Sequence, residues 1–112
     1  VGVLGGKKFD TVYDKDSFGA LDASMRGAYC DRIAEHTADG AVVYMEVKLK
    51  DEDHPQKLSG PPYSLEMEDL METSNFGTAF DYVSVLGEVC SLQLPMMSQT
   101  GHILSRKPRN TA

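Results

Sequence analysis

The chain lacks several features that would place it at once in a functional class. It has no tryptophan and only two cysteines, Cys30 and Cys90, which form no CxxC or CxxxH spacing. Two distant cysteines are typical of buried thiols in a reducing compartment, and a disulfide between them is the alternative. The apolar run at the start of the chain is too short for a signal peptide or a membrane span. We therefore expect a cytoplasmic protein with no membrane partner.

Positive charge is also in short supply. The chain has 11 lysines and arginines against 17 aspartates and glutamates, which gives a formal net charge of −6. Such a chain would repel phosphates rather than neutralise them, so we expect no nucleic-acid partner. The only basic cluster, Arg106, Lys107 and Arg109, is typical of a solubilising tail. With 112 residues the chain can form one modest core, and residues 1–112 are predicted to be a single domain.

A helical pattern precedes the centre of the chain. The apolar positions that share one arc near the helical period are Leu21, Met25, Ala28, Tyr29 and Ile33. This pattern predicts a helix that starts near Phe18, is capped by Asp16 or Ser17, and stops at Asp39-Gly40. Because two glycines weaken the helix, a break near Ser24 into two helices is the alternative. Upstream, residues 9–13 are expected to form an earlier helix or irregular structure.

A strand with clean alternation follows the helix. In residues 41–50, Val43, Met45, Val47 and Leu49 point to one side, and Tyr44, Glu46, Lys48 and Lys50 point to the other. This alternation predicts a strand with one buried face.

The last third of the chain predicts a loop, a short helix and antiparallel strands. Residues 51–62 contain Gly60-Pro61-Pro62 and should form a loop. Ser64 is expected to cap a helix over residues 64–73. Residues 82–94 predict a hairpin around Gly87-Glu88, with Val85 facing Cys90, and residues 101–105 supply a final strand. The fold class is therefore α+β, with helices packed on one face of a curved, mainly antiparallel sheet.

Four short motifs occur in the same order as in a known superfamily. They are Ala-Leu-Asp-Ala at 20–23, Ala-Asp-Gly-Ala-Val-Val at 38–43, Ser-Gly at 59–60 and Thr-Gly-His-Ile at 100–103. With the order of elements, they resemble the nuclear-transport-factor-two-like superfamily, which includes ketosteroid isomerase and the SnoaL-like polyketide cyclases. The resemblance implies a cone-like sheet around an apolar pocket. The segment after the second helix is about one strand short, which implies an incomplete cone.

The resemblance does not carry over the isomerase chemistry. The general-base carboxylate of ketosteroid isomerase would fall at Met45, and its oxyanion-side tyrosine would fall at Ser17. Neither a thioether nor a hydroxymethyl group can replace those ionisable groups. We therefore expect the classical steroid-isomerase site to be absent.

Two groups of polar residues are candidates for a site. Asp22, together with Arg32 and His36, lies on or beside the apolar arc of the predicted helix, although a helix break would leave all three in solvent. Tyr44, Glu46 and Tyr82 would converge if the polar faces of two strands line a concave sheet, where a desolvated glutamate beside phenols could transfer a proton. The alternative is the solvated face of an antiparallel sheet.

The predicted function is the binding of a hydrophobic small molecule in an apolar pocket, with Asp22, Tyr44, Met45, Glu46 and Tyr82 as ligand-binding residues. The sharper version is a lyase or isomerase that uses Tyr and Glu as acid and base. Asp51–His54 has neither the spacing of a calcium loop nor a second histidine for zinc, so no metal and no cofactor are expected. The alternative is a non-catalytic domain that forms a homodimer through Leu86 and Val89, so the sequence leaves the question of enzyme or binding domain open.

Overall fold

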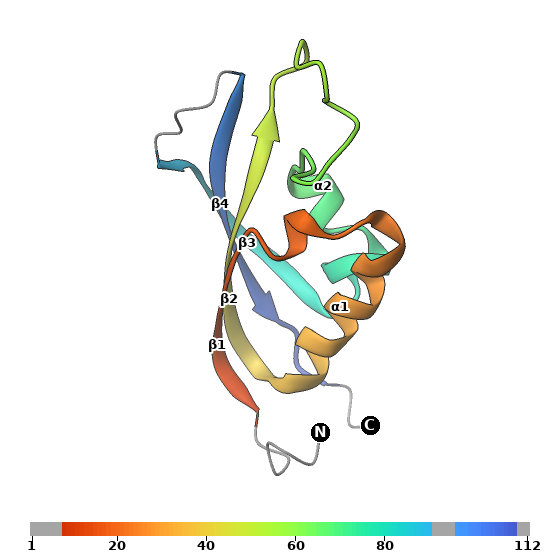
Figure 1. Ribbon diagram of the computed structural model, residues 1–112. Coiled ribbons are helices and arrows are strands. Elements are labelled where there is room, and N and C mark those ends of the chain that lie inside the picture. Colours follow the sequence, from red (N-terminus) through yellow and green to blue (C-terminus); the bar gives the residue numbers. More distant parts are fainter. Residues whose placement is uncertain (1–7, 91–95, 110–112) are drawn as a thin grey trace.

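A computed structural model describes residues 8–90 and 96–109, which form four strands and short helices (Figure 1). The strands are β1 (Phe9–Lys15), β2 (Thr37–Lys50), β3 (Phe80–Cys90) and β4 (Met97–Arg106). The helical elements are a 3₁₀ turn (Phe18–Ala20), α1 (Ala23–His36), α2 (Met67–Leu70) and a π-turn (Thr73–Gly77). None of the described helices is long and apolar enough to cross a membrane. The structure therefore has the predicted α+β class.

The four strands form one sheet in the order β1-β2-β4-β3. β2 pairs with β4 and β3 pairs with β4 in antiparallel fashion, whereas β1 pairs with β2 in parallel. Figure 1 shows that α1 and α2 both lie on the same side of this curved sheet. The sheet is open, with β1 and β3 as its edges within the described residues. It is thus mainly antiparallel and uncovered by these helices on its second face.

The core lies between the sheet and the helices. Val43, Met45 and Val47 of β2 are fully buried there, as the alternation of this strand predicted. The other buried apolar residues of this cluster come from the helices, the loops and the neighbouring strands: Phe18, Cys30, Leu65, Leu70, Phe76, Phe80 and Leu104. Cys30 is a free thiol in this core. The side chain of Cys90 lies outside what the structure describes, so a disulfide to it remains untested.

The structure corrects two predictions near the start of the chain. Residues 9–13 are neither helix nor irregular, because they belong to β1. Its buried side carries the polar Asp14 while Phe9 and Tyr13 are exposed, so the sequence shows no hydrophobic alternation there. The predicted helix is interrupted at residues 21–22, and Asp22 rather than Asp16 or Ser17 caps α1 by accepting a hydrogen bond from the Ser24 amide at 3.1 Å. The predicted break is therefore real, but it lies before Ser24.

The helix also ends earlier than Asp39-Gly40. α1 stops at His36, and Asp39-Gly40 lies inside β2, where Gly40 has a φ of 78°. The reason is found in the C-terminal segment, since the carbonyl of Ala34 accepts hydrogen bonds from Arg106 and Arg109. Arginine side chains that bind the last carbonyls terminate a helix as a glycine cap would. The basic cluster therefore holds the helix end and is more than a solubilising tail.

The predicted hairpin around Gly87-Glu88 is wrong. β3 runs straight through both residues and pairs with β4, with Val85 opposite His102 rather than Cys90. Gly87 does adopt a positive φ of 73°, but it uses this freedom at an irregularity in the β3–β4 ladder. The predicted strand 89–94 falls largely on residues outside the described part. The predicted final strand 101–105 is confirmed as part of β4.

The short helix near residue 70 is shorter than predicted. α2 begins after Glu66, whose side chain forms a capping box with Asp69, so Ser64 is not its cap. The Ser64 hydroxyl instead accepts a hydrogen bond from the Lys50 amide at 2.9 Å. This contact ties the loop that follows β2 back to the strand, and it places the first turn of α2 over β3 and β4.

Candidate functional site

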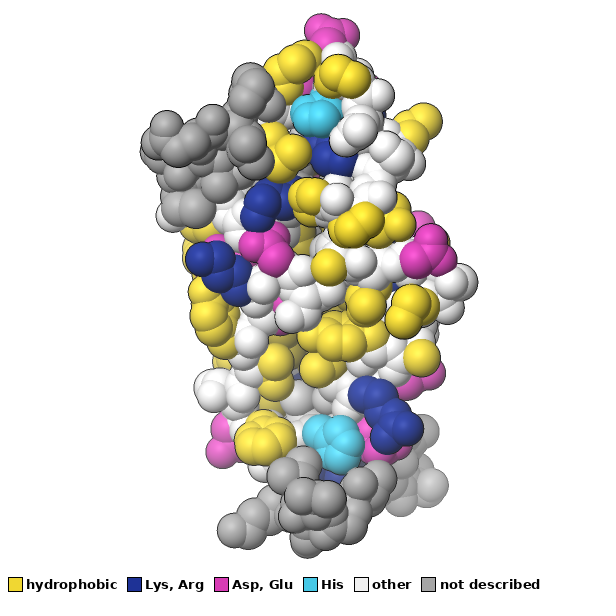
Figure 2. Space-filling model, in the orientation of Figure 1, with side chains coloured by type: hydrophobic (Ala, Val, Ile, Leu, Met, Phe, Trp, Pro, Cys, Tyr) yellow, Lys and Arg dark blue, Asp and Glu magenta, His cyan; other side chains and the backbone are white. Residues whose placement is uncertain are grey.

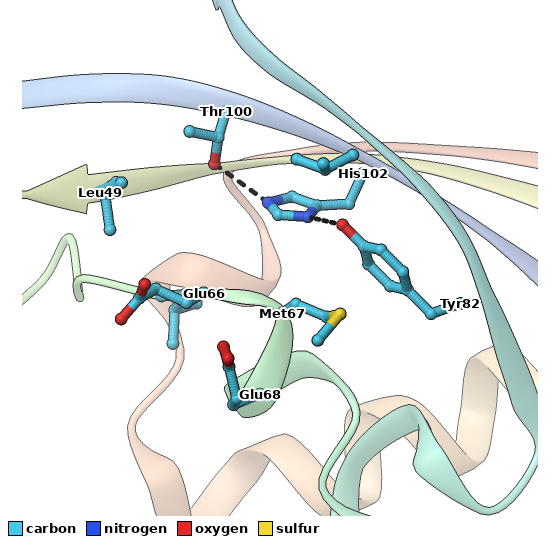
Figure 3. Close-up of a pocket in the computed structure, with 9 residues that line it drawn as sticks. Leu49, Glu66, Met67, Glu68, Tyr82, Thr100 and His102 are labelled. Carbon is cyan, nitrogen blue, oxygen red and sulfur yellow. Dashed lines mark hydrogen bonds between the residues drawn. The ribbon is translucent and has the colours of Figure 1, made fainter.

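A small cavity lies between the first turn of α2 and the helix-covered face of the sheet. Its volume is about 220 Å³ and most of its wall is apolar. We call it the His102 pocket; its lining comprises Leu49, Leu65, Glu66, Met67, Glu68, Tyr82, Val85, Thr100 and His102. Figure 3 shows most of these side chains around the cavity. Sites for small molecules are typically such apolar hollows with a few convergent polar groups.

His102 is the polar centre of this pocket. Its Nδ1 atom lies 2.7 Å from the hydroxyl oxygen of Tyr82, and its Nε2 atom lies 3.0 Å from the hydroxyl oxygen of Thr100, as the dashed lines in Figure 3 mark. The Thr100 hydroxyl donates to the carbonyl of Val47 at 3.5 Å, so it is placed to accept from His102. The tautomer with its proton on Nε2 is the one that satisfies all these groups, because Nε2 then donates to Thr100 and Nδ1 accepts from Tyr82.

Burial keeps this hydrogen-bonded pair uncharged. His102 is only 3% exposed, and its burial lowers the pKa of the imidazole below its ordinary value. Burial also raises the pKa of the Tyr82 phenol, and the nearby negative charge of Glu68 adds to this effect. Near neutral pH the pocket therefore presents a neutral imidazole and a neutral phenol, joined by one hydrogen bond.

The full charges that line the pocket are both negative. Glu66 and Glu68 stand at the first turn of α2, and in Figure 3 the Glu68 carboxylate lies across the cavity from His102. Glu66 is engaged in the capping box with Asp69. Within the described residues, Glu68 forms neither a hydrogen bond nor an ion pair. The pocket thus has an apolar body and an acidic rim.

A second polar cluster lies on the uncovered face of the sheet. Glu46, only 9% exposed, accepts hydrogen bonds from the Tyr44 hydroxyl at 2.8 Å and from the Gln99 amide at 3.0 Å. Tyr13 stacks on Tyr44 and its hydroxyl approaches Glu46 at 3.4 Å. Burial raises the pKa of Glu46, but the hydrogen bonds from Gln99 and Tyr44 outweigh it, and the net pKa is lowered. Glu46 is therefore an anchored carboxylate rather than a poised general base.

The structure separates the predicted ligand-binding residues. Tyr44 and Glu46 do meet, but Tyr82 lies on the opposite face of the sheet, in the His102 pocket. Met45 packs in the core, where it pairs with His102 across the β2–β4 ladder without lining the pocket. Asp22 caps α1 and lines a different, more polar hollow with Arg26 and Tyr63. The predicted convergence of Tyr82 with Tyr44 and Glu46 is thus wrong.

His102 and Thr100 were missed as site residues. The signal was present, because Thr100, His102 and Leu104 alternate along β4 and share its buried face. The erroneous hairpin concealed it, since it paired residues 82–86 with residues 89–94. A β3–β4 pairing would have placed Tyr82 beside His102.

A larger apolar groove lies elsewhere, between β1 and α1. Its volume is about 370 Å³, and it is lined by Phe9, Thr11, Val12, Arg32, Ile33, His36 and Thr37. Arg32 and His36, which were named as candidates together with Asp22, thus lie in this groove and apart from Asp22. The groove presents no hydrogen-bonded pair like that of Tyr82 and His102, so we regard the smaller pocket as the candidate site.

The apolar and charged side chains on the face seen in Figure 2 are interspersed rather than gathered in one patch. Within the described residues, no three or more His, Cys, Asp or Glu side chains are grouped so that they could hold a metal ion. The features that distinguish the His102 pocket are its hydrogen bonds and its acidic rim.

The sequence matches no protein-family model and no curated protein. The fold, however, is similar to that of solved structures. One is TehB from Haemophilus influenzae, with a TM-score of 0.62 and 15% identity over 90% of this chain and 36% of TehB. Another comes from work on the conversion of a disulfide bond into a thioacetal group during echinomycin biosynthesis, with a TM-score of 0.65 and 15% identity over 97% of this chain and 53% of the other.

These matches show a shared fold alone. The chain spans about a third of the length of TehB and about half of the echinomycin protein. The resemblance to the nuclear-transport-factor-two-like superfamily is not confirmed by these matches. Neither the sequence pattern nor the resemblance led us to expect the parallel strand β1.

Proposed function

We propose that this chain binds an apolar small molecule in the His102 pocket. The observation that carries the proposal is the buried hydrogen bond between Tyr82 and His102 at the wall of an otherwise apolar cavity. A buried polar pair beside an empty apolar space can orient a ligand through one hydrogen bond while the walls bury its surface. The cavity is below the usual range of about 300–1,000 Å³, so the ligand is small.

The sharper form of the proposal is acid–base chemistry by the same pair. In the tautomer with its proton on Nε2, His102 accepts at Nδ1 from the Tyr82 hydroxyl. The phenol oxygen can in turn accept a hydrogen bond from a ligand hydroxyl. A neutral imidazole behind a phenol can accept the proton of a bound acid, as a general base does in a lyase or an isomerase. In this form His102 takes the role of base that the sequence suggested for Glu46, while Tyr82 keeps its predicted role as the acid.

A thermal-shift screen of small hydrophobic and aromatic compounds tests binding. A ligand that binds only the folded state raises the melting temperature. Val85 and Val83 allow a matched control, because both are 57% exposed on β3 but only Val85 lines the pocket. We expect Val85→Lys to abolish the stabilisation and Val83→Lys to retain it. If no compound stabilises the protein, or if both variants respond as the wild type does, the proposal fails.

The fold match favours a second candidate function, in which the chain forms the acceptor-binding part of a group-transfer enzyme. One neighbour is named for the conversion of a disulfide bond into a thioacetal group, a reaction that joins carbon to sulfur. In open α/β sheets, ligands bind outside the carboxyl ends of the strands. The parallel strands β1 and β2 end at Lys15 and Lys50, so a methyl donor would be sought beside these residues.

The residues at those strand ends do not fit a methyl donor. Lys48 donates to Asp16 at 2.8 Å and also binds Gln99, and the Gln99 amide donates back to Asp16 at 3.2 Å. These side chains hold one another, so we derive no transfer step through them. The second candidate predicts that S-adenosylmethionine raises the melting temperature of the chain. An unchanged melting temperature in excess S-adenosylmethionine would remove it.

A further inference from the structure

The charge at the rim of the His102 pocket narrows the class of ligand, given that the pocket binds a small molecule as proposed above. An apolar cavity selects for an apolar body, but it does not by itself select for charge. Among the described residues of the lining, the two charged ones, Glu66 and Glu68, are both carboxylates, and none is a lysine or an arginine. The charge at the described rim of the pocket is thus entirely negative.

Glu68 is the carboxylate that is open to a ligand. Glu66 accepts a hydrogen bond from the backbone of Asp69, which is part of the helix cap. Glu68 has no hydrogen-bond or ion-pair partner among the described residues, and Figure 3 shows its carboxylate directed toward the space between α2 and His102. An unpaired carboxylate at the mouth of an apolar hollow is complementary to a cation attached to an apolar group.

The opposite wall complements the same ligand. Tyr82 and His102 share one hydrogen bond and are both neutral, so they neither repel a cation nor neutralise Glu68. The net charge of −6 for the whole chain acts in the same direction.

We propose that the ligand of the His102 pocket is an apolar amine, whose protonated nitrogen pairs with Glu68 while its hydrocarbon part lies against Leu49, Leu65 and Val85. The acidic rim disfavours the binding of an anion of the same shape. A neutral molecule of the same shape can fill the cavity but forms no ion pair.

Calorimetric titration of three probes of one shape tests the inference. The probes are phenethylamine, phenethyl alcohol and hydrocinnamate, which carry a cation, a neutral hydroxyl and an anion on a similar body. We expect phenethylamine to bind about two- to fivefold more tightly than phenethyl alcohol, the range of an ion pair at an exposed carboxylate such as Glu68. Hydrocinnamate should bind most weakly, and added salt should narrow the differences.

Two variants with the same change of charge separate a contact from a long-range field. Glu68→Gln should remove the preference for phenethylamine over phenethyl alcohol. Glu72→Gln, which alters an exposed carboxylate outside the pocket lining, should leave the preference intact. Equal loss in both variants would show a diffuse field and overturn the assignment to Glu68.

The outcomes also separate this inference from the proposed function. If amine and alcohol bind equally at the His102 pocket, the amine inference fails and small-molecule binding stands. If hydrocinnamate binds best, the inference fails for the same reason. If none of the three probes binds and the broader screen also finds no ligand, both proposals fall together.

Discussion

At the scale of single residues, Gly101 is required by the polar cluster on the uncovered face. A Cβ atom at this position would lie 2.8 Å from Val89 and 3.1 Å from the Tyr44 hydroxyl, so the Val89 side chain would have to shift and the Tyr44 ring would have to move by a few tenths of an ångström. We expect Gly101→Ala to lower the free energy of unfolding by about 1–3 kcal/mol, as overpacking does. Chemical denaturation measures this. Gly19→Ala is the control, because its Cβ would meet its neighbours only at ordinary distances of 3.8 Å or more; an equal loss in both variants would contradict the account.

His102 gives the protein a pH dependence of known sign. Because burial lowers the pKa of the folded imidazole, the unfolded chain binds a proton at higher pH than the folded chain does. The contribution of His102 to stability is therefore complete above about pH 6.5, the ordinary value, and is lost as the pH falls through the lowered folded pKa. Urea denaturation from about pH 7.5 down to 5.5 should show this slope.

The variant His102→Gln should flatten that slope, whereas His36→Gln, outside the pocket, should preserve it. NMR titration of the imidazole provides the direct check. A His102 pKa at or above that of a free histidine would contradict the described burial.

At the scale of elements, the joint between β1 and α1 depends on one buried carboxylate. Asp14 in β1 accepts from the Ser17 amide at 2.8 Å and from the Tyr29 hydroxyl of α1. Removal of one partner leaves a buried acceptor unsatisfied, so we expect Tyr29→Phe to cost about 1–3 kcal/mol of unfolding free energy. Tyr13→Phe is the control, since Tyr13 is 63% exposed and its hydroxyl lies at a longer 3.4 Å from Glu46. Similar losses by denaturation would refute the role of Asp14.

The elements that the sequence predicted well are those whose signal is local. β2 has one dry face, so its alternation identified Val43, Met45 and Val47 as core residues. The errors arose where residues distant in the sequence determine where a helix or a strand ends. Arg106 and Arg109 end α1 at His36, four residues before the predicted stop at Gly40, and no local signal in the helix reveals them. Gly87 resembles a turn residue in the sequence but serves an irregularity of a continuous strand.

The candidate site was only partly predictable for the same reason. Tyr82 was identified because it is a polar aromatic residue on a strand, but its partner His102 depends on which strand pairs with β3. Glu46 and Tyr44 were correctly expected to be neighbours because they are two residues apart on one strand face. The side chains that complete their cluster, Gln99 and Tyr13, come from β4 and from β1, which the sequence did not predict.

At the scale of the whole molecule, the exposed edge of the sheet makes self-association testable. Val83, Val85 and Leu86 are all at least half exposed on β3, which pairs only with β4 within the described residues. Apolar edge strands promote pairing between chains. If the alternative prediction of a homodimer holds, sedimentation should show concentration-dependent association that Leu86→Lys weakens. Leu58→Lys, at a 95% exposed loop position, should not weaken it. A monomer at all concentrations would remove this alternative.

The central claim is that a small apolar molecule occupies the His102 pocket, and an NMR titration of the labelled chain tests it most directly. The compound that stabilises the protein best in the thermal screen is added to saturation, and the amide and imidazole resonances are followed. Binding in the His102 pocket should concentrate the shifts at Leu65, Val85, Thr100 and His102, which line the cavity. Shifts that concentrate in the groove between β1 and α1, at Val12 and Ile33, would contradict it.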